Sequence, residues 1–152
     1  MPTDTVSETE AELIACNCTA LRQASRHMSK FYDEALVSID LATNQYSILS
    51  RLQRHGPRSI QDLAAMLVMD RSTLGHLLRP LEKRDLVRLT TTAQDKRRRV
   101  IVLTPAGEAL VTQARPLWAA AQARFEQAFG ADNAETLRRI LRQVEKTDLS
   151  KA

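Results

Sequence analysis

The sequence predicts a mainly α-helical fold with one small β-hairpin, and three observations support this prediction. Apolar residues recur at helical spacing through most of the 152 residues, and only four glycines and five prolines interrupt them. Residues 59–84 divide into two helices joined by a tight turn. Two β-rich runs, 86–92 and 100–104, flank a basic loop. A helix pair followed by a basic hairpin predicts a winged helix-turn-helix core.

The N-terminal part is predicted to be a disordered stretch, residues 1–9, followed by one long helix over residues 10–40. The apolar side chains of this helix form a single stripe. A helix of this length cannot bury its stripe inside a small monomer, so we expect an N-terminal dimerisation helix. The stripe consists of Ile14, Cys18, Leu21, Ala24, Met28, Phe31 and Ala35.

Two further helices are predicted before the tight turn. The first covers residues 43–54, with Thr43 as its N-cap, and Gly56-Pro57 ends it. The second is short, and Ser59 caps it with Asp62 at the third helical position. A very short extra strand can precede Ser59.

The helix after the turn is predicted to begin behind Asp70, which is a favourable N-cap. Pro80 lies inside it and should bend its axis, because proline removes one backbone hydrogen bond. The helix should end near Asp85, where glycine would adopt a left-handed cap more easily.

The C-terminal part is predicted to hold two more helices. Thr104-Pro105 is a typical helix start, and Gly130 should end this helix. Asp132 with Glu135 predicts the start of the last helix. We expect residues 105–152 to be C-terminal dimerisation helices around a DNA-binding domain of residues 41–104.

Positive charge is concentrated in the middle of the chain. The net charge is +4, but residues 51–104 hold twelve Lys or Arg against five Asp or Glu. Such a basic zone is typical of a protein that binds double-stranded DNA or another polyanion. The alternative, on charge alone, is a solvated charged face.

Several other classes are not expected. No apolar stretch reaches the roughly 20 residues that span a bilayer. The N-terminus is acidic and does not have the pattern of a signal peptide. The two cysteines lie two positions apart and give no disulfide framework. We therefore expect a cytoplasmic protein without membrane contact. His27, His55 and His76 lie on separate elements, and no nucleophile, metal or phosphate-loop motif accompanies them. We expect neither an enzyme nor a cofactor or metal.

The candidate DNA contacts lie on the helix behind Asp70 and on the basic loop. In a helix-turn-helix, the second helix enters the major groove with its N-terminal residues at the base edges. In the loop, Arg97 suits a narrow minor groove, and Asp95 would orient it through a charge-assisted hydrogen bond. The candidates are Arg71, Ser72, Thr73, His76 and Arg79 on the helix, and Asp95, Arg97, Arg98 and Arg99 in the hairpin.

These motifs resemble the MarR family of winged-helix regulators. The resemblance implies a cytoplasmic homodimer, usually a repressor, that binds a pseudo-palindromic operator and releases it on meeting a small effector or an oxidant. Asp85 departs from the family pattern, which has glycine there, and so does the pair Gly75-His76. The matching residues are Leu63-Ala64, Met69 to Leu74, Leu81 to Arg84, Leu86-Val87, Asp95 to Arg97 and Val102 to Gly107.

Cys18 is a candidate redox switch. It lies on the apolar stripe, and its surroundings are similar to the first helix of the organic-hydroperoxide-sensing branch of the family. In that branch tyrosines hydrogen-bond the reactive thiolate. Tyr32 matches one of them, but Arg22 and Thr43 stand in place of the other two. The alternative is that Cys18 is a small buried hydrophobic residue.

An effector pocket is expected where the first, second and fifth helices meet the DNA-binding domain. A cation there would suit an acidic aromatic or acyl ligand. A further alternative for the whole chain is a winged-helix module that binds protein, although the basic centre argues against it. The candidate pocket residues are Arg22, Arg26, Tyr32, Tyr46 and Trp118.

Overall fold

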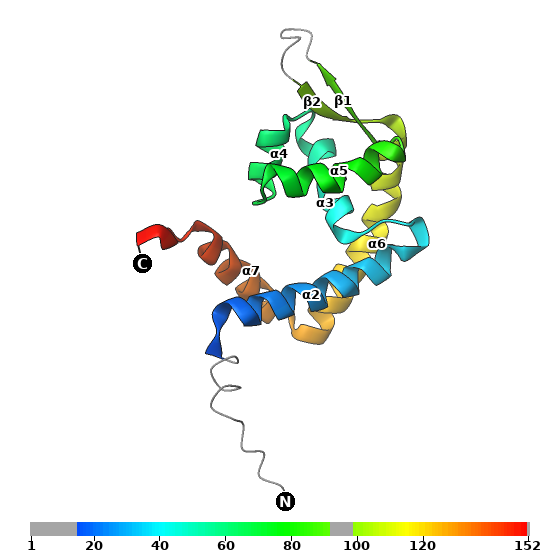
Figure 1. Ribbon diagram of the computed structural model, residues 1–152. Coiled ribbons are helices and arrows are strands. Elements are labelled where there is room, and N and C mark those ends of the chain that lie inside the picture. The colour runs from blue at the N-terminus through cyan, green and yellow to red at the C-terminus, as the bar shows by residue number, and fades with distance from the viewer. Residues whose placement is uncertain (1–14, 92–98, 152) are drawn as a thin grey trace, which may run out of the picture.

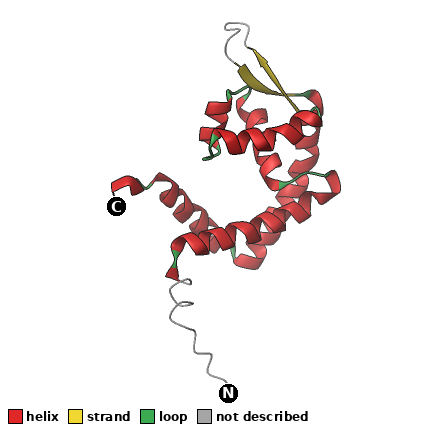
Figure 2. Ribbon diagram, in the orientation of Figure 1, coloured by secondary structure: helices red, strands yellow, loops and turns green. Residues whose placement is uncertain are grey.

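The computed structural model describes residues 15–91 and 99–151. Helices dominate the fold and the two strands form one antiparallel pair, as Figure 2 shows, so the predicted fold class is confirmed. The expected order of elements is also confirmed. The elements are α2 (Asn17–Leu36), a 3-10 turn (Val37–Ile39), α3 (Thr43–His55), α4 (Ile60–Met66), α5 (Arg71–Lys83), β1 (Val87–Thr91), β2 (Arg99–Leu103), α6 (Pro105–Phe129), α7 (Ala131–Lys146) and a final 3-10 turn (Leu149–Lys151).

The chain is divided into a lobe and a pair of arms (Figure 1). The reading lobe consists of α3, α4, α5, β1 and β2. The arms consist of α2, the C-terminal half of α6 and α7. Helix α6 joins the two parts, because it packs on α3 within the lobe and on α2 and α7 within the arms. None of the described helices has an apolar stretch of membrane-spanning length.

The core of the reading lobe is made by the apolar sides of its helices and strands. Leu49 of α3, Leu63 of α4 and Leu74 of α5 are each fully buried. Ile101 of β2 closes this core from the hairpin side. Five elements therefore bury their apolar faces against one another within a single chain.

The hairpin has a regular antiparallel register that runs from Val87 opposite Leu103 to Thr91 opposite Arg99. Arg58 adds one isolated bridge on the other side of β2, where its N–H donates to the carbonyl of Ile101 at 3.2 Å and its carbonyl accepts from the Ile101 N–H at 2.7 Å. The expected short extra strand before Ser59 is thus present as a single bridge.

A single continuous helix to residue 40 is wrong within the described residues, and its predicted start at residue 10 lies outside them. Cys16 has an extended backbone, so α2 begins at Asn17, and it ends at Leu36. Asp40 then takes a left-handed conformation with φ of 50°. This reversal turns the chain so that Leu41 enters the core of the lobe, and a continuous helix to residue 40 would prevent it.

Two predicted helix starts are also wrong. Ala42, not Thr43, is the N-cap of α3, and the Thr43 N–H donates to Asp33 Oδ1 at 2.6 Å instead. Gly130, with φ of 92°, both ends α6 and caps α7, so Asp132 lies within the first turn of α7. The observed N-cap thus lies one residue before the predicted one in α3 and two residues before it in α7.

Candidate nucleic-acid interface

The start of α5 is held by Asp70. Its Oδ1 accepts from the Thr73 N–H at 2.8 Å, and its Oδ2 accepts from the Thr73 hydroxyl at 2.6 Å. These hydrogen bonds hold the pKa of Asp70 below its ordinary value. The predicted cap is confirmed. Because the Thr73 hydroxyl donates its proton to Asp70, it can only accept a hydrogen bond from a nucleic acid.

One face of α5 is apolar and the other is polar. Leu74, Leu78 and Leu81 are buried against the lobe. The opposite face is free for a ligand, and it carries cations and small polar groups at the end of the helix that a winged helix presents to the major groove. The exposed candidate residues of α5 are Arg71, Ser72, Thr73, His76 and Arg79.

Gly75 lies on the same polar face, four residues from both Arg71 and Arg79. A Cβ built at this position meets no atom within 4 Å. The fold therefore gives no steric reason for glycine here, although glycine within a helix costs about 1 kcal/mol relative to alanine. Its small size leaves room on the outer surface of α5.

The hairpin contributes one described candidate, Arg99, which is exposed at the start of β2 opposite Thr91. Asp95, Arg97 and Arg98 lie outside the described residues. Strand β1 packs on α5, so the base of the hairpin lies next to this helix.

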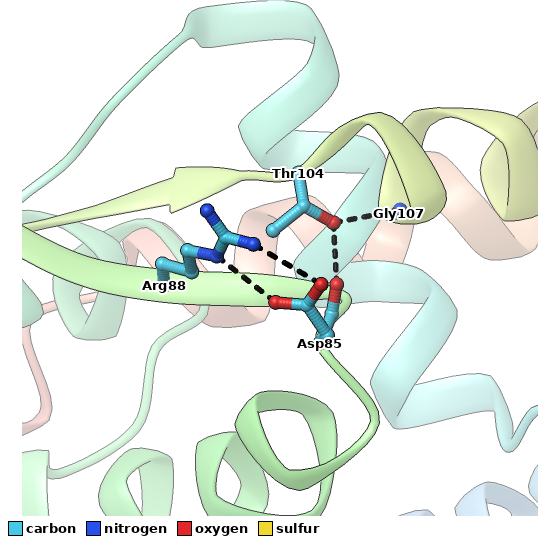
Figure 3. Close-up of polar contacts among 4 residues, drawn as sticks. All are labelled: Asp85, Arg88, Thr104 and Gly107. Carbon is cyan, nitrogen blue, oxygen red and sulfur yellow. Dashed lines mark hydrogen bonds and ion pairs between the residues drawn. The ribbon is translucent and has the colours of Figure 1, made fainter.

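Thr104 joins the end of α5 to the start of α6 (Figure 3). Its hydroxyl donates to the main-chain carbonyl of Asp85 at 2.6 Å and accepts from the Gly107 N–H at 3.0 Å. Its own N–H donates to the carbonyl of Leu86 at 3.1 Å. Thr104 is only 3% exposed, so these bonds are shielded from water. The predicted helix start at Thr104 is confirmed, and it also anchors α6 to the reading lobe.

Asp85 and Gly107 make this junction compact. Asp85 has a left-handed backbone with φ of 54°, as predicted from its place in the sequence. Its carboxylate accepts from Arg88 Nε at 2.9 Å and from Nη2 at 3.2 Å, which holds the pKa of Asp85 below its ordinary value. A Cβ on Gly107 would lie 2.2 Å from the Leu86 carbonyl oxygen, so only glycine fits.

A second tie joins α5 to the end of α2. Arg84 Nη1 donates to the carbonyl oxygen of Asp40 at 2.6 Å, and Arg84 Nη2 lies 3.9 Å from Asp40 Oδ2. The helix with the candidate DNA contacts is therefore connected both to α6 and to the segment that follows α2.

A cavity of about 810 Å³ lies between α3 and α6. Tyr46 and Trp118 line it, as expected for the effector pocket, and their ring centroids are 4.9 Å apart. Tyr32 stacks on Trp118 at 4.2 Å. Burial raises the pKa of Tyr46, and burial together with the Glu126 carboxylate raises that of Tyr32.

The predicted cations are not the ones that line this cavity. Arg22 does not line it, and Arg26 lines a separate groove of about 550 Å³ formed by α2 and the 3-10 turn that follows. The cavity instead contains cations that sequence reasoning missed, although their helical spacing from Tyr46 and Trp118 was a usable signal. They are Arg51 and Arg54 of α3 and Arg115 of α6, and His55 of α3 also lines the cavity.

The two cysteines lie near the start of α2. Cys18 is exposed in the single chain, as the apolar stripe that is expected to meet a second copy would be, so the described residues do not bury it as a small hydrophobic side chain. The Tyr32 hydroxyl donates to Gln122 Oε1 instead of a thiolate. Hydrogen bonds from Thr19 lower the pKa of the Cys16 thiol. The described residues contain no cluster of His, Cys, Asp or Glu able to hold a metal.

Known proteins with similar sequences and folds are transcriptional regulators. The model of the MarR family matches residues 41–98. The HTH-type transcriptional repressor NicR of Pseudomonas putida is 29% identical over 91 residues, which are 60% of this chain and 58% of NicR. The chain thus spans about three fifths of the length of the curated relatives it matches.

Two solved structures with DNA share the fold. The M. tuberculosis transcriptional regulator MosR in complex with DNA is 31% identical, with a TM-score of 0.76 over 85% of this chain and 92% of that chain. The transcriptional repressor CouR bound to a 23-mer DNA duplex is 26% identical, with a TM-score of 0.80 over 89% of this chain and 96% of that chain.

Proposed function

We propose that this chain, which belongs to the MarR family, is a DNA-binding transcriptional regulator that represses from a pseudo-palindromic operator. The observation that carries the proposal is the exposed polar face of α5, which is capped by Asp70 and followed by a basic hairpin. MosR and CouR, which share the fold, were solved with DNA. The excess of cations over residues 51–104 supports the same ligand.

In this proposal, α5 enters the major groove. Arg71 and His76 contact base edges, with Ser72 beside them, and Arg79 binds phosphate. The hairpin lies along the adjacent minor groove, where Arg97 is the inserted cation, Asp95 orients it, and Arg98 and Arg99 bind phosphate.

The regulator acts as a homodimer, in which residues 10–40 and 105–152 pair with their copies and each domain of residues 41–104 reads one half-site. The arms support this assembly, because they leave apolar side chains uncovered. Phe129 and Ile140 are each 45% exposed, and Val144 is 44% exposed. Two-fold pairing of such faces is the commonest way to cover them.

A small molecule that enters the α3–α6 cavity is the proposed effector. The cavity touches α6, and α6 is anchored through Thr104 to the end of α5. A ligand that shifts α6 relative to α3 therefore changes the position of α5, and with it the spacing of the two lobes on the operator.

DNA binding can be tested with duplexes that the protein selects from a random-sequence library. Replacing Arg71 with Ala should weaken binding of the selected duplex about 5- to 100-fold and relax the preference at one base pair. Arg26→Ala, which removes the same charge outside the interface, is the matched control. Failure of the unaltered protein to retain any duplex at low salt would contradict the proposed function and favour a protein-binding module.

A further inference from the structure

The cavity between α3 and α6 collects positive charge without negative charge. Three arginines and one histidine line it, and no Asp or Glu does. Within the described residues, the ion pairs lie elsewhere, and none involves a cation of this cavity. Arg54 and Arg115 are exposed and Arg51 is half-buried, so water screens part of their mutual repulsion, and a bound anion would offset the rest.

The contacts of these cations position them without neutralising them. Arg115 Nη2 donates to Gln53 Oε1 at 2.7 Å, and Arg51 Nη1 donates to Ser47 Oγ at 2.9 Å. Arg54 lies in the last turn of α3, where the helix dipole favours a cation. The dipole does not explain Arg115, which comes from α6. Two separate helices therefore bring guanidinium groups to one cavity.

The same two helices also bring aromatic side chains to the cavity. Tyr46 and Trp118 line it, and Tyr32 supports the far side of the Trp118 ring. The volume of about 810 Å³ exceeds what a single-ring acid fills, since cavities of about 300–1,000 Å³ hold ligands of drug size. The cavity thus combines a flat apolar surface with a strongly basic end.

We propose that this cavity binds a ligand that joins an aromatic or acyl group to a doubly charged phosphate. The ring packs on Tyr46 and Trp118, and the phosphate lies between Arg54 and Arg115. A phosphate is favoured over a carboxylate because it offers more acceptor oxygens and more charge to several guanidinium groups. The inference rests on the proposed function only in that the ligand is the effector; its binding needs no DNA.

Calorimetric titration of the full chain with 1-naphthyl phosphate and 1-naphthoate tests the proposal, because the two probes share a ring system and differ in charge. At pH 8 an aryl phosphate is a dianion. We expect the phosphate to bind at least about tenfold more tightly than the carboxylate. Arg54→Gln and Arg115→Gln should each weaken phosphate binding about tenfold, since each removes a charge-assisted hydrogen bond.

Arg26→Gln is the matched control, because it removes the same charge from α2 outside the cavity and should leave both affinities unchanged. Equal affinity for the two probes, no detectable phosphate binding, or an equal loss in Arg26→Gln would overturn the proposal. If inorganic phosphate binds as tightly as the aryl phosphate, the ligand ring contributes nothing to the affinity, and the proposed aromatic contact is wrong.

A separate arm keeps this inference distinct from the proposed function. The selected duplex is titrated with and without saturating 1-naphthyl phosphate, and weaker DNA binding is expected with the probe. Absence of DNA binding would contradict the proposed function while the calorimetric result stands. Probe binding without an effect on DNA would overturn the assignment of this ligand class to the effector.

Discussion

The reading lobe and the arms both contain several helices but differ in how they cover their apolar side chains. In the lobe, Leu49, Leu74 and Leu81 have no exposed surface. In the arms, Ile140 and Val144 of α7 keep almost half of theirs. The lobe therefore has a core that is covered within one chain, whereas the arms leave apolar side chains exposed, and in the proposed homodimer a second copy covers them.

This difference indicates where stability and assembly each reside. A substitution inside the lobe should act on folding at any protein concentration. A substitution on the arms should act on pairing, and its effect should depend on concentration. Four variants test this division, from the largest expected effect on the free energy of unfolding to the smallest.

Leu74→Ala should destabilise the protein by about 2–5 kcal/mol, because it opens a cavity on the fully buried face of α5. Urea unfolding followed by circular dichroism measures the loss. Ser72→Ala, on the exposed face two residues earlier, is the control and should change stability by less than about 0.5 kcal/mol. Similar losses in the two variants would show that α5 is not packed as described.

Gly107→Ala should cost about 1–3 kcal/mol, since the new methyl group would overlap a carbonyl oxygen of the backbone, which cannot move aside as a side chain can. Ala106→Gly, one position away, is a control for the change in helix propensity. If Gly107→Ala unfolds at the same urea concentration as the parent chain, the close junction of α6 with the lobe is incorrect.

Gly75→Ala should raise stability by about 0.5–1 kcal/mol, because alanine is the better helix former and nothing in the fold meets its methyl group. Binding of the selected duplex should nevertheless fall about fivefold, or about 1 kcal/mol, if DNA approaches this surface closely. A stabilised variant with unaltered DNA affinity would remove Gly75 from the interface.

The pair Ile140→Glu and Val144→Glu should change the unfolding of the lobe by less than about 0.5 kcal/mol, since surface substitutions act weakly on folding. It should abolish the dimer in analytical ultracentrifugation and remove the dependence of the melting temperature on concentration. Glu145→Ala, on the same exposed helix, is the control. A double variant that still sediments as a dimer would contradict pairing through α7.

Features set by neighbouring residues were predictable from the sequence. At Ser59, Asp70 and Thr104, the predicted cap requires the side chain to accept from the N–H three residues later. All three hydrogen bonds are present. The left-handed position at Asp85 was predicted for the same reason, because the end of a helix requires it.

Features set by distant residues were not predictable. The end of α2 is fixed by the turn at Asp40, which Arg84 holds from the other side of the lobe. The cations of the cavity come from two helices about sixty residues apart, as the Arg115–Gln53 hydrogen bond shows. Arg26 was expected in the cavity because it lies on the helix that was expected to border it. The packing of α2 on α6 decides which face of α2 borders the cavity, and the sequence of α2 alone does not.

Trp118 is the only tryptophan of the chain and lies between Tyr46 of α3 and Tyr32 of α2. Its indole is therefore an intrinsic fluorophore located where the lobe, the arms and the cavity meet. The fluorescence emission and quenching of Trp118 therefore depend on its distance from Tyr46, which belongs to the reading lobe, and from Tyr32, which belongs to the arms. The protein can thus be followed optically through ligand binding and unfolding without any attached dye.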